Sequence, residues 1–184
     1  WSLLKAEKIT NLPGQPPVSF DQYSGYIVLN NATNKSLFYW FQESQNDPAT
    51  DPVTFWTAGG PACSGLTGLL LEEGAFRIQQ NGTLAIRQYP WNAVSNMLYV
   101  EQPIGVGFSY SNDDNDYKSG DERAAADMYD MILGFLDEFP QYESNDFFIA
   151  SESYGGHYIP VLAKYIVDHN TDGAINFKGF LVGN

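Results

Sequence analysis

Six short stretches of the chain carry the apolar runs and alternation of hydrophobic and polar positions that are typical of β-strands. They are residues 23–29, 36–42, 53–57, 97–101, 146–150 and 177–182. Two other stretches predict helices. Residues 121–139 place apolar side chains on one face and stop before Pro140, and residues from about 155 to 169 follow a strand directly, with Pro160 near the first turn or at a kink.

The order of these elements predicts an α/β fold with a mixed sheet. The early strands follow one another closely and favour an antiparallel meander, whereas the later strands alternate with helices. The chain has 184 residues, 43% of them hydrophobic, with no internal repeat and no linker. We therefore expect residues 1–184 to belong to a single domain.

The net charge excludes some classes of partner, and glycosylation sequons indicate the cellular compartment. The net charge is −13, with nine Lys and Arg, which argues against nucleic acid or an anionic membrane as a partner. The apolar runs fall far short of a membrane span. Sequons at Asn31, Asn34 and Asn81 predict glycosylation and a secretory or lysosomal route. Cys63 is the single cysteine, so a disulfide within these 184 residues is excluded.

The stretch Ser151-Glu152-Ser153-Tyr154-Gly155, between a predicted strand and a predicted helix, is close to the nucleophile-elbow pattern G-x-S-x-G. Such a corner lifts a serine hydroxyl clear of the sheet, at the start of a helix whose dipole favours developing negative charge. Ser151 replaces the first glycine of the pattern. The alternative is an ordinary strand-to-helix loop in which the serine caps the helix.

A second glycine-rich stretch, residues 57–64 (TAGGPACS), follows another predicted strand. An elbow serine needs such a loop, because one oxyanion donor comes from the residue after the nucleophile and a second from a loop after an earlier strand. A tight turn with glycines chosen for positive φ is the alternative. The two motifs stand in the expected order, which favours a catalytic serine at position 153.

Several motifs together resemble the serine carboxypeptidase family of α/β-hydrolases, which includes cathepsin A. They are Tyr23-Ser24-Gly25-Tyr26, Leu37-Phe38-Tyr39-Trp40-Phe41, Gly59-Gly60-Pro61 with Cys63-Ser64, Gln102-Pro103, Gly105-Val106-Gly107-Phe108-Ser109-Tyr110, and Glu152-Ser153-Tyr154 with Gly155-Gly156-His157-Tyr158-Ile159-Pro160. They run in family order across almost the whole chain.

The resemblance implies a peptidase that removes one C-terminal residue through an acyl-enzyme on Ser153. It also implies an oxyanion hole formed by the N–H groups of Gly60 and Tyr154, and no cofactor or metal. Glu152 and Glu72 would bind the terminal carboxylate of a peptide substrate. A glutamate that faces a carboxylate must keep a proton, so an acidic compartment, lysosomal, vacuolar or extracellular, suits the site. The alternative for Glu72 is a surface glutamate at a helix end.

Two positions depart from the family pattern. Ala58 stands where the family usually has asparagine, and Ala62 stands where it usually has glycine. Plant acyltransferases of the same family also alter the carboxylate-binding set. An acyltransferase or lyase is therefore an alternative, and a non-catalytic protective or binding homologue is another.

The acid and base of a catalytic triad have no convincing candidates among these residues. In α/β-hydrolases the order is Ser, Asp or Glu, then His, and the histidines here are His157 and His169. The resemblance implies a structural role for His157, and His169 lies at a helix end, where a solvated or dipole-facing role is expected. We expect the triad partners on a C-terminal remainder or a second chain, and leave a homodimer open. The resemblance implies that the disulfide partner of Cys63 also lies in that C-terminal part.

Overall fold

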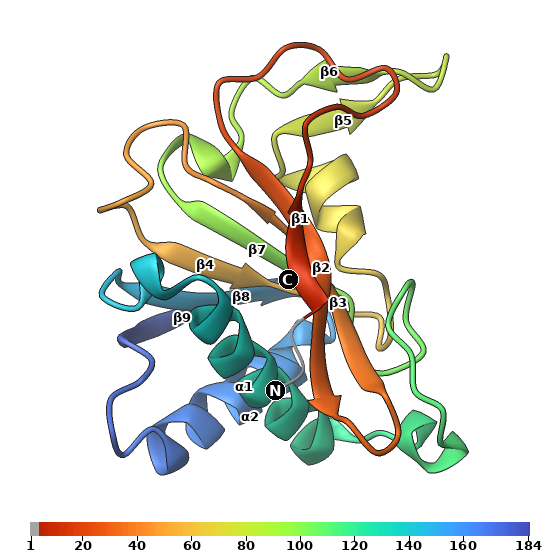
Figure 1. Cartoon of the computed structure of the whole chain (residues 1–184), viewed down its shortest axis with the longest axis vertical. Coiled ribbons are helices and arrows are strands. Elements are labelled where there is room, and N and C mark those ends of the chain that lie inside the picture. The colour runs from red at the N-terminus through yellow and green to blue at the C-terminus, as the bar shows by residue number, and fades with distance from the viewer. Residues whose placement is uncertain (1–3) are drawn as a thin grey trace.

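The computed structural model describes residues 4–184 as a twisted seven-stranded sheet with two long helices packed on one face (Figure 1). The sheet strands are β1 (Leu4–Lys8), β2 (Gln22–Asn30), β3 (Lys35–Gln42), β4 (Val53–Trp56), β7 (Asn96–Val100), β8 (Phe147–Glu152) and β9 (Phe177–Gly183). Their order across the sheet is β1-β2-β3-β7-β4-β8-β9. The mixed sheet predicted from the sequence is confirmed.

Antiparallel pairing ends in the middle of the sheet. Strands β1, β2 and β3 form a meander, and β3 pairs antiparallel with β7. From β7 onward the strands β4, β8 and β9 are parallel to one another. The strand predicted at 53–57 does not extend the meander, because β7 lies between β3 and β4. This arrangement brings the carboxyl ends of β4 and β8 side by side.

Alternating side chains of the central strands supply two separate cores. Phe55, Leu98 and Ile149 face the helices α1 (Asp121–Glu138) and α2 (Gly155–His169), in a large cluster that includes Met128, Phe135 and Leu162. Trp56, Met97, Tyr99 and Ala150 face the other way, against Leu69 of the short helix η1 (Gly68–Glu72). The element η1 thus covers the second face of the sheet near the ends of β4 and β8.

The remaining elements are short. A hairpin of β5 (Phe76–Ile78) and β6 (Leu84–Ile86) follows η1 and lies at the top of Figure 1. The 3₁₀ turns are η2 (Trp91–Ala93), η3 (Asp114–Tyr117) and η4 (Pro140–Tyr142). Pro160 lies inside α2. In the described part of the chain, no helix combines the length and the apolar character needed to cross a membrane.

Candidate active site

Ser153 sits at the corner between β8 and α2. Strand β8 ends at Glu152 and helix α2 begins at Gly155, so the chain turns within two residues. Ser153 has a φ of 55°, in the left-handed region that side chains normally avoid at a cost of about 1–2 kcal/mol. Its N–H donates to the Gly183 carbonyl at 2.9 Å, and its carbonyl accepts from Gly156 at 2.9 Å. The corner is therefore held from both sides, and the Ser153 residue is exposed.

The serine that replaces the first glycine of the elbow pattern is accommodated by a glycine further along. Ser151 is buried, with 1% of its surface exposed. A Cβ added to Gly155 would lie 1.9 Å from Ser151 Oγ. The hydroxyl of Ser151 thus occupies the space that any larger residue at 155 would fill. This local exchange explains how the corner forms without a glycine at position 151.

The glycine-rich loop after β4 packs directly on this corner. A Cβ on Gly59 would lie 2.4 Å from the Glu152 carbonyl oxygen and 2.6 Å from the Tyr154 nitrogen, so only glycine allows the approach. Gly60 has a φ of 109°. Within residues 4–184, the N–H groups of Gly60 and Tyr154 donate no backbone hydrogen bond. The fold therefore places the loop that carries Gly60 against Tyr154, with two backbone donors left over.

A buried carboxylate, Glu101, fixes the outer part of the same loop. Glu101 is 1% exposed; its Oε1 accepts from Ser64 Oγ and its Oε2 from the Phe108 N–H at 2.6 Å. Ala62, at the position where the family pattern has glycine, adopts a φ of 66°. Ala58 is buried, with 2% exposed. Glu101 was not predicted as a site residue, because its one signal in the sequence is an acid at the end of an apolar strand.

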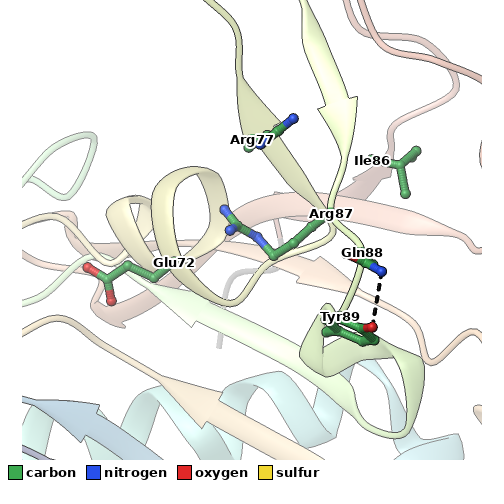
Figure 2. A pocket seen from close by; sticks show the side chains of 6 residues that line it. All are labelled: Glu72, Arg77, Ile86, Arg87, Gln88 and Tyr89. Carbon is green, nitrogen blue, oxygen red and sulfur yellow. Dashed lines mark hydrogen bonds between the residues drawn. The ribbon is translucent and has the colours of Figure 1, made fainter.

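Two of the predicted site residues, Glu152 and Glu72, are glutamates that lie in different surroundings. Glu152 is half-buried and its Oε1 accepts from the Gly59 N–H at 3.2 Å. Partial burial raises the pKa of the Glu72 carboxyl, the negative charge of Glu152 raises it further, and Arg87 opposes the rise. Figure 2 shows Arg87 extending toward the turn that carries Glu72, whose carboxylate points the other way. The charge of Glu152 thus acts on Glu72, which is exposed at the last residue of η1.

A third glutamate, missed by the sequence analysis, lies buried under Glu72. Glu73 is 7% exposed, and burial, followed by the charge of Glu72, raises the pKa of its carboxyl from 4.5 to about 8. Its Oε1 finds no hydrogen-bond partner among residues 4–184. A Cβ on Gly68 would lie 2.3 Å from both Glu73 Oε1 and Trp56 Nε1, so both groups converge on that glycine. Adjacent glutamates give no sequence signal of which one is buried.

The histidines are engaged elsewhere. His157 stacks on the Tyr154 ring at 4.6 Å, and its Nδ1 lies 4.0 Å from Asp121 Oδ2. His169 Nδ1 lies 2.8 Å from the Tyr165 carbonyl oxygen, and its ring stacks on that of Tyr165. Both rings contact residues of α1 and of α2 or its N-cap, and His169 is exposed at the end of α2, where a solvated or dipole-facing role was expected.

The remaining predicted residues lie on the surface. Asn31, Asn34 and Asn81 are exposed, and Cys63 is an exposed free thiol in the described chain. Glycosylation and the disulfide stay predictions. Among residues 4–184, no group of three or more His, Cys, Asp or Glu side chains could hold a metal ion.

Comparisons with known proteins identify the family. The family model described as serine carboxypeptidase matches residues 13–184. Serine carboxypeptidase 24 of Arabidopsis thaliana is 48% identical, over 97% of this chain and 40% of its own length. Serine carboxypeptidase-like 40 of the same plant is 46% identical, over 99% of this chain and 37% of its own. The chain thus spans about two fifths of the length of these relatives.

Solved structures give the same assignment. The prohormone-processing carboxypeptidase Kex1 of Saccharomyces cerevisiae superposes with a TM-score of 0.81 at 28% identity, over 90% of this chain and 39% of the yeast chain. A peroxisomal alpha-beta-hydrolase of the same yeast, 11% identical with a TM-score of 0.50, shares the fold, over 89% of this chain and 44% of its own. The chain belongs to the serine carboxypeptidase family and forms part of an α/β-hydrolase fold.

Proposed function

We propose that the protein carrying this sequence is a serine carboxypeptidase that forms an acyl-enzyme on Ser153. The observation that carries the proposal is the corner itself. Ser153 has a φ of 55°, and the Gly59 backbone approaches the Tyr154 nitrogen so closely that a Cβ would lie 2.6 Å from it. An ordinary capped loop requires neither the strain nor the close approach. Membership of the family supports the same reading.

In the proposed reaction, Ser153 Oγ attacks the carbonyl carbon of the last peptide bond and loses its proton to a histidine base. The N–H groups of Gly60 and Tyr154 stabilise the oxyanion, and each such donor contributes about 3 kcal/mol to the transition state. The C–N bond then breaks, and the leaving amino acid takes the proton. Water hydrolyses the acyl-enzyme. The proposal places the triad Asp and His on a part of the protein outside these 184 residues.

Recognition of the free C-terminus rests, in this proposal, on Glu152 and Glu72. A carboxyl that keeps its proton donates a hydrogen bond to the substrate carboxylate, whereas an ionised one repels it. The raised pKa of Glu72 supports this role, because partial burial and then the neighbouring charge of Glu152 favour its protonated form. Such a site works best at acidic pH, which fits the proposed vacuolar, lysosomal or extracellular location.

The test is the release of a C-terminal residue from blocked dipeptides. The same dipeptide is offered to the full-length protein with a free carboxylate and as its C-terminal amide, at acidic pH. The proposal expects release of the free amino acid and a clear preference for the acid over the amide. Efficient cleavage of internal peptide bonds, with no such preference, would contradict it.

Acyl transfer is the second candidate, and Ala58 is the observation that favours it. Ala58 is buried beside the oxyanion loop and offers no side-chain donor to a substrate carboxylate. A small-molecule acyl donor without a terminal carboxylate needs no such hydrogen-bond donor, so Ala58 would not weaken its binding. Transfer of an acyl group from an ester to a hydroxyl acceptor, faster than hydrolysis of any blocked dipeptide, would establish this alternative.

A further inference from the structure

A positively charged pocket opens between η1 and the β5–β6 hairpin, beside the proposed carboxylate site. Its volume is about 400 Å³, and it is lined by Glu72, Arg77, Ile86, Arg87, Gln88 and Tyr89 (Figure 2). Two arginines and one glutamate line it, in a chain that contains only nine Lys and Arg against 22 Asp and Glu. The pocket therefore carries a positive charge in a molecule whose net charge is negative.

Neither arginine forms an ion pair with a carboxylate in the part of the chain that the structure describes. The ion pairs in residues 4–184 are made by Lys8, Lys35, Arg123, His157, Lys164 and Lys178, and neither Arg77 nor Arg87 is among them. Acidic side chains outnumber basic ones more than twofold in this chain, so two unpaired arginines on one pocket call for an explanation.

Arg87 is held in place although it is unpaired. Its Nε donates to the Gly74 carbonyl at 3.0 Å, and its Nη2 donates to the Phe76 carbonyl at 3.2 Å. The guanidinium has five N–H groups in a rigid fork, so donors remain for a ligand. Little side-chain entropy is left to lose on binding, because these two hydrogen bonds already fix the group. Just after β6, Gln88 Nε2 donates to Tyr89 Oη at 3.0 Å.

The pocket adjoins the proposed site through Glu72. Glu72 lines the pocket, and its carboxyl lies within the field of Glu152, the residue before Ser153. A peptide whose terminal carboxylate lies at Glu72 and Glu152 would have the side chain of its last residue close to this pocket. An acidic side chain there would come near the Arg87 guanidinium, which extends toward the turn that carries Glu72, in a pocket that Arg77 also lines.

We propose that the Arg77–Arg87 pocket binds the carboxylate side chain of the leaving residue, so that the enzyme favours peptides ending in aspartate or glutamate. This specificity rests on the proposed carboxypeptidase function. Guanidinium groups bind carboxylates through two parallel hydrogen bonds, and such charge-assisted bonds are about twice as strong as neutral ones. Glutamine has the same shape as glutamate without the charge, so the comparison of the two isolates the effect of the arginines.

The experiment measures binding and turnover separately, in the full-length protein. Binding of free glutamate and glutamine, the products of the proposed reaction, is followed by calorimetry at about pH 6, where the glutamate side chain is ionised. Turnover is followed with blocked dipeptides ending in Glu, Gln or Lys. We expect glutamate to bind about tenfold more tightly than glutamine, and the Glu peptide to be preferred by a similar factor in kcat/KM.

Variants assign the preference to the pocket. Arg77→Gln removes one charge without touching the two hydrogen bonds that hold Arg87, and Arg87→Gln removes the fixed guanidinium. Lys118→Gln is the matched control, because Lys118 is exposed and makes no ion pair in the described chain, outside this pocket. The glutamate-to-glutamine affinity ratio should fall toward one in both arginine variants and stay unchanged in Lys118→Gln.

The outcomes separate this specificity from the proposed function. Equal affinity for glutamate and glutamine, or a preference that survives Arg77→Gln and Arg87→Gln, overturns the pocket assignment, even if peptides are cleaved. If glutamate is preferred and this preference requires the arginines, the pocket is upheld as an acidic-ligand site. If the same protein cleaves no peptide, the peptidase assignment is overturned instead.

Discussion

The backbone of Gly59 lies against the backbone of Tyr154, so closely that a Cβ at position 59 would sit 2.6 Å from the Tyr154 nitrogen. This contact joins the loop after β4 to the corner after β8. It requires parallel strands whose carboxyl ends meet, which the pairing of β4 with β8 provides. The two proposed oxyanion donors therefore depend on one glycine that supplies neither of them.

Gly59→Ala should impair both stability and catalysis, because the new methyl group meets backbone atoms that cannot rotate away. We expect a loss of about 1–3 kcal/mol in the free energy of unfolding from the overpacked contact. Activity should fall at least about a hundredfold, as when one oxyanion donor is lost. Gly179→Ala is the control, because its nearest neighbour would lie 4.0 Å away. Equal behaviour of the two variants in unfolding and turnover assays would refute the contact.

Gly155→Ala should be destabilising and Ser151→Gly should rescue it. The added Cβ would lie 1.9 Å from Ser151 Oγ, so removing that hydroxyl frees the space. In denaturant unfolding, the single Gly155→Ala variant should lose about 1–3 kcal/mol, and the double variant should recover more than additivity allows. A double variant whose loss equals the sum of the single losses would show that the two sites do not share this space.

The free energy of unfolding should fall as pH rises, because the buried Glu73 carboxyl must then ionise. The pKa of Glu73 is raised on folding from 4.5 to about 8, so the folded state holds its proton more tightly than the unfolded state. Its favourable contribution is complete below about pH 4.5 and is lost as pH rises toward 8, with a full amplitude on the order of 3 to 5 kcal/mol.

Glu73→Gln should remove this dependence, because the amide stays neutral at every pH. Urea unfolding of the wild type and the variant at several pH values between 4 and about 8.5 measures the effect. Glu143→Gln, an exposed glutamate distant in sequence, should leave the slope unchanged. If wild type and Glu73→Gln lose stability in parallel on raising pH, the buried carboxyl is not the cause.

Substrate binding should weaken with pH through Glu72. The pKa of Glu72 is raised, so the carboxyl stays protonated to a higher pH than an ordinary glutamate and then ionises. For peptides with a free C-terminus, KM should climb with pH while kcat changes less, because ground-state binding is what is lost. C-terminal amides should show little change. Glu72→Gln should flatten the climb, and a KM profile that stays identical in this variant would exclude Glu72.

The sequence predicted the main strands and both long helices because each buries a periodic apolar face. Helix α2 begins at Gly155, as expected from the elbow, and α1 ends at Glu138, one residue before the predicted end. The strands β5 and β6 are three residues each, too short for a period to show. Strand β1, with the sequence LKAEK, is too polar to signal a strand. It joins the sheet by pairing antiparallel with β2.

The sequence predicts those site residues that belong to motifs. It does not predict residues whose burial or pairing depends on tertiary contacts. Ser153 and the loop of Gly60 follow from glycine spacing after apolar strands. The burial of Glu73 depends on how η1 packs over Trp56 and Tyr99, which adjacent glutamates do not reveal. The insertion of β7 between β3 and β4 likewise comes from long-range pairing. Arg87 gave no signal, because its role follows from carbonyl groups that the hairpin turns toward it.

Labelling with a fluorophosphonate tests the central claim most directly. The full-length protein is treated at its working pH, digested, and mapped by mass spectrometry beside the variants Ser153→Ala and Ser151→Ala. Ser151 lies in the same corner but is buried, so it serves as the matched control. The account predicts a single adduct on Ser153, lost in Ser153→Ala and retained in Ser151→Ala. An active preparation that is labelled elsewhere, or not labelled at all, would contradict it.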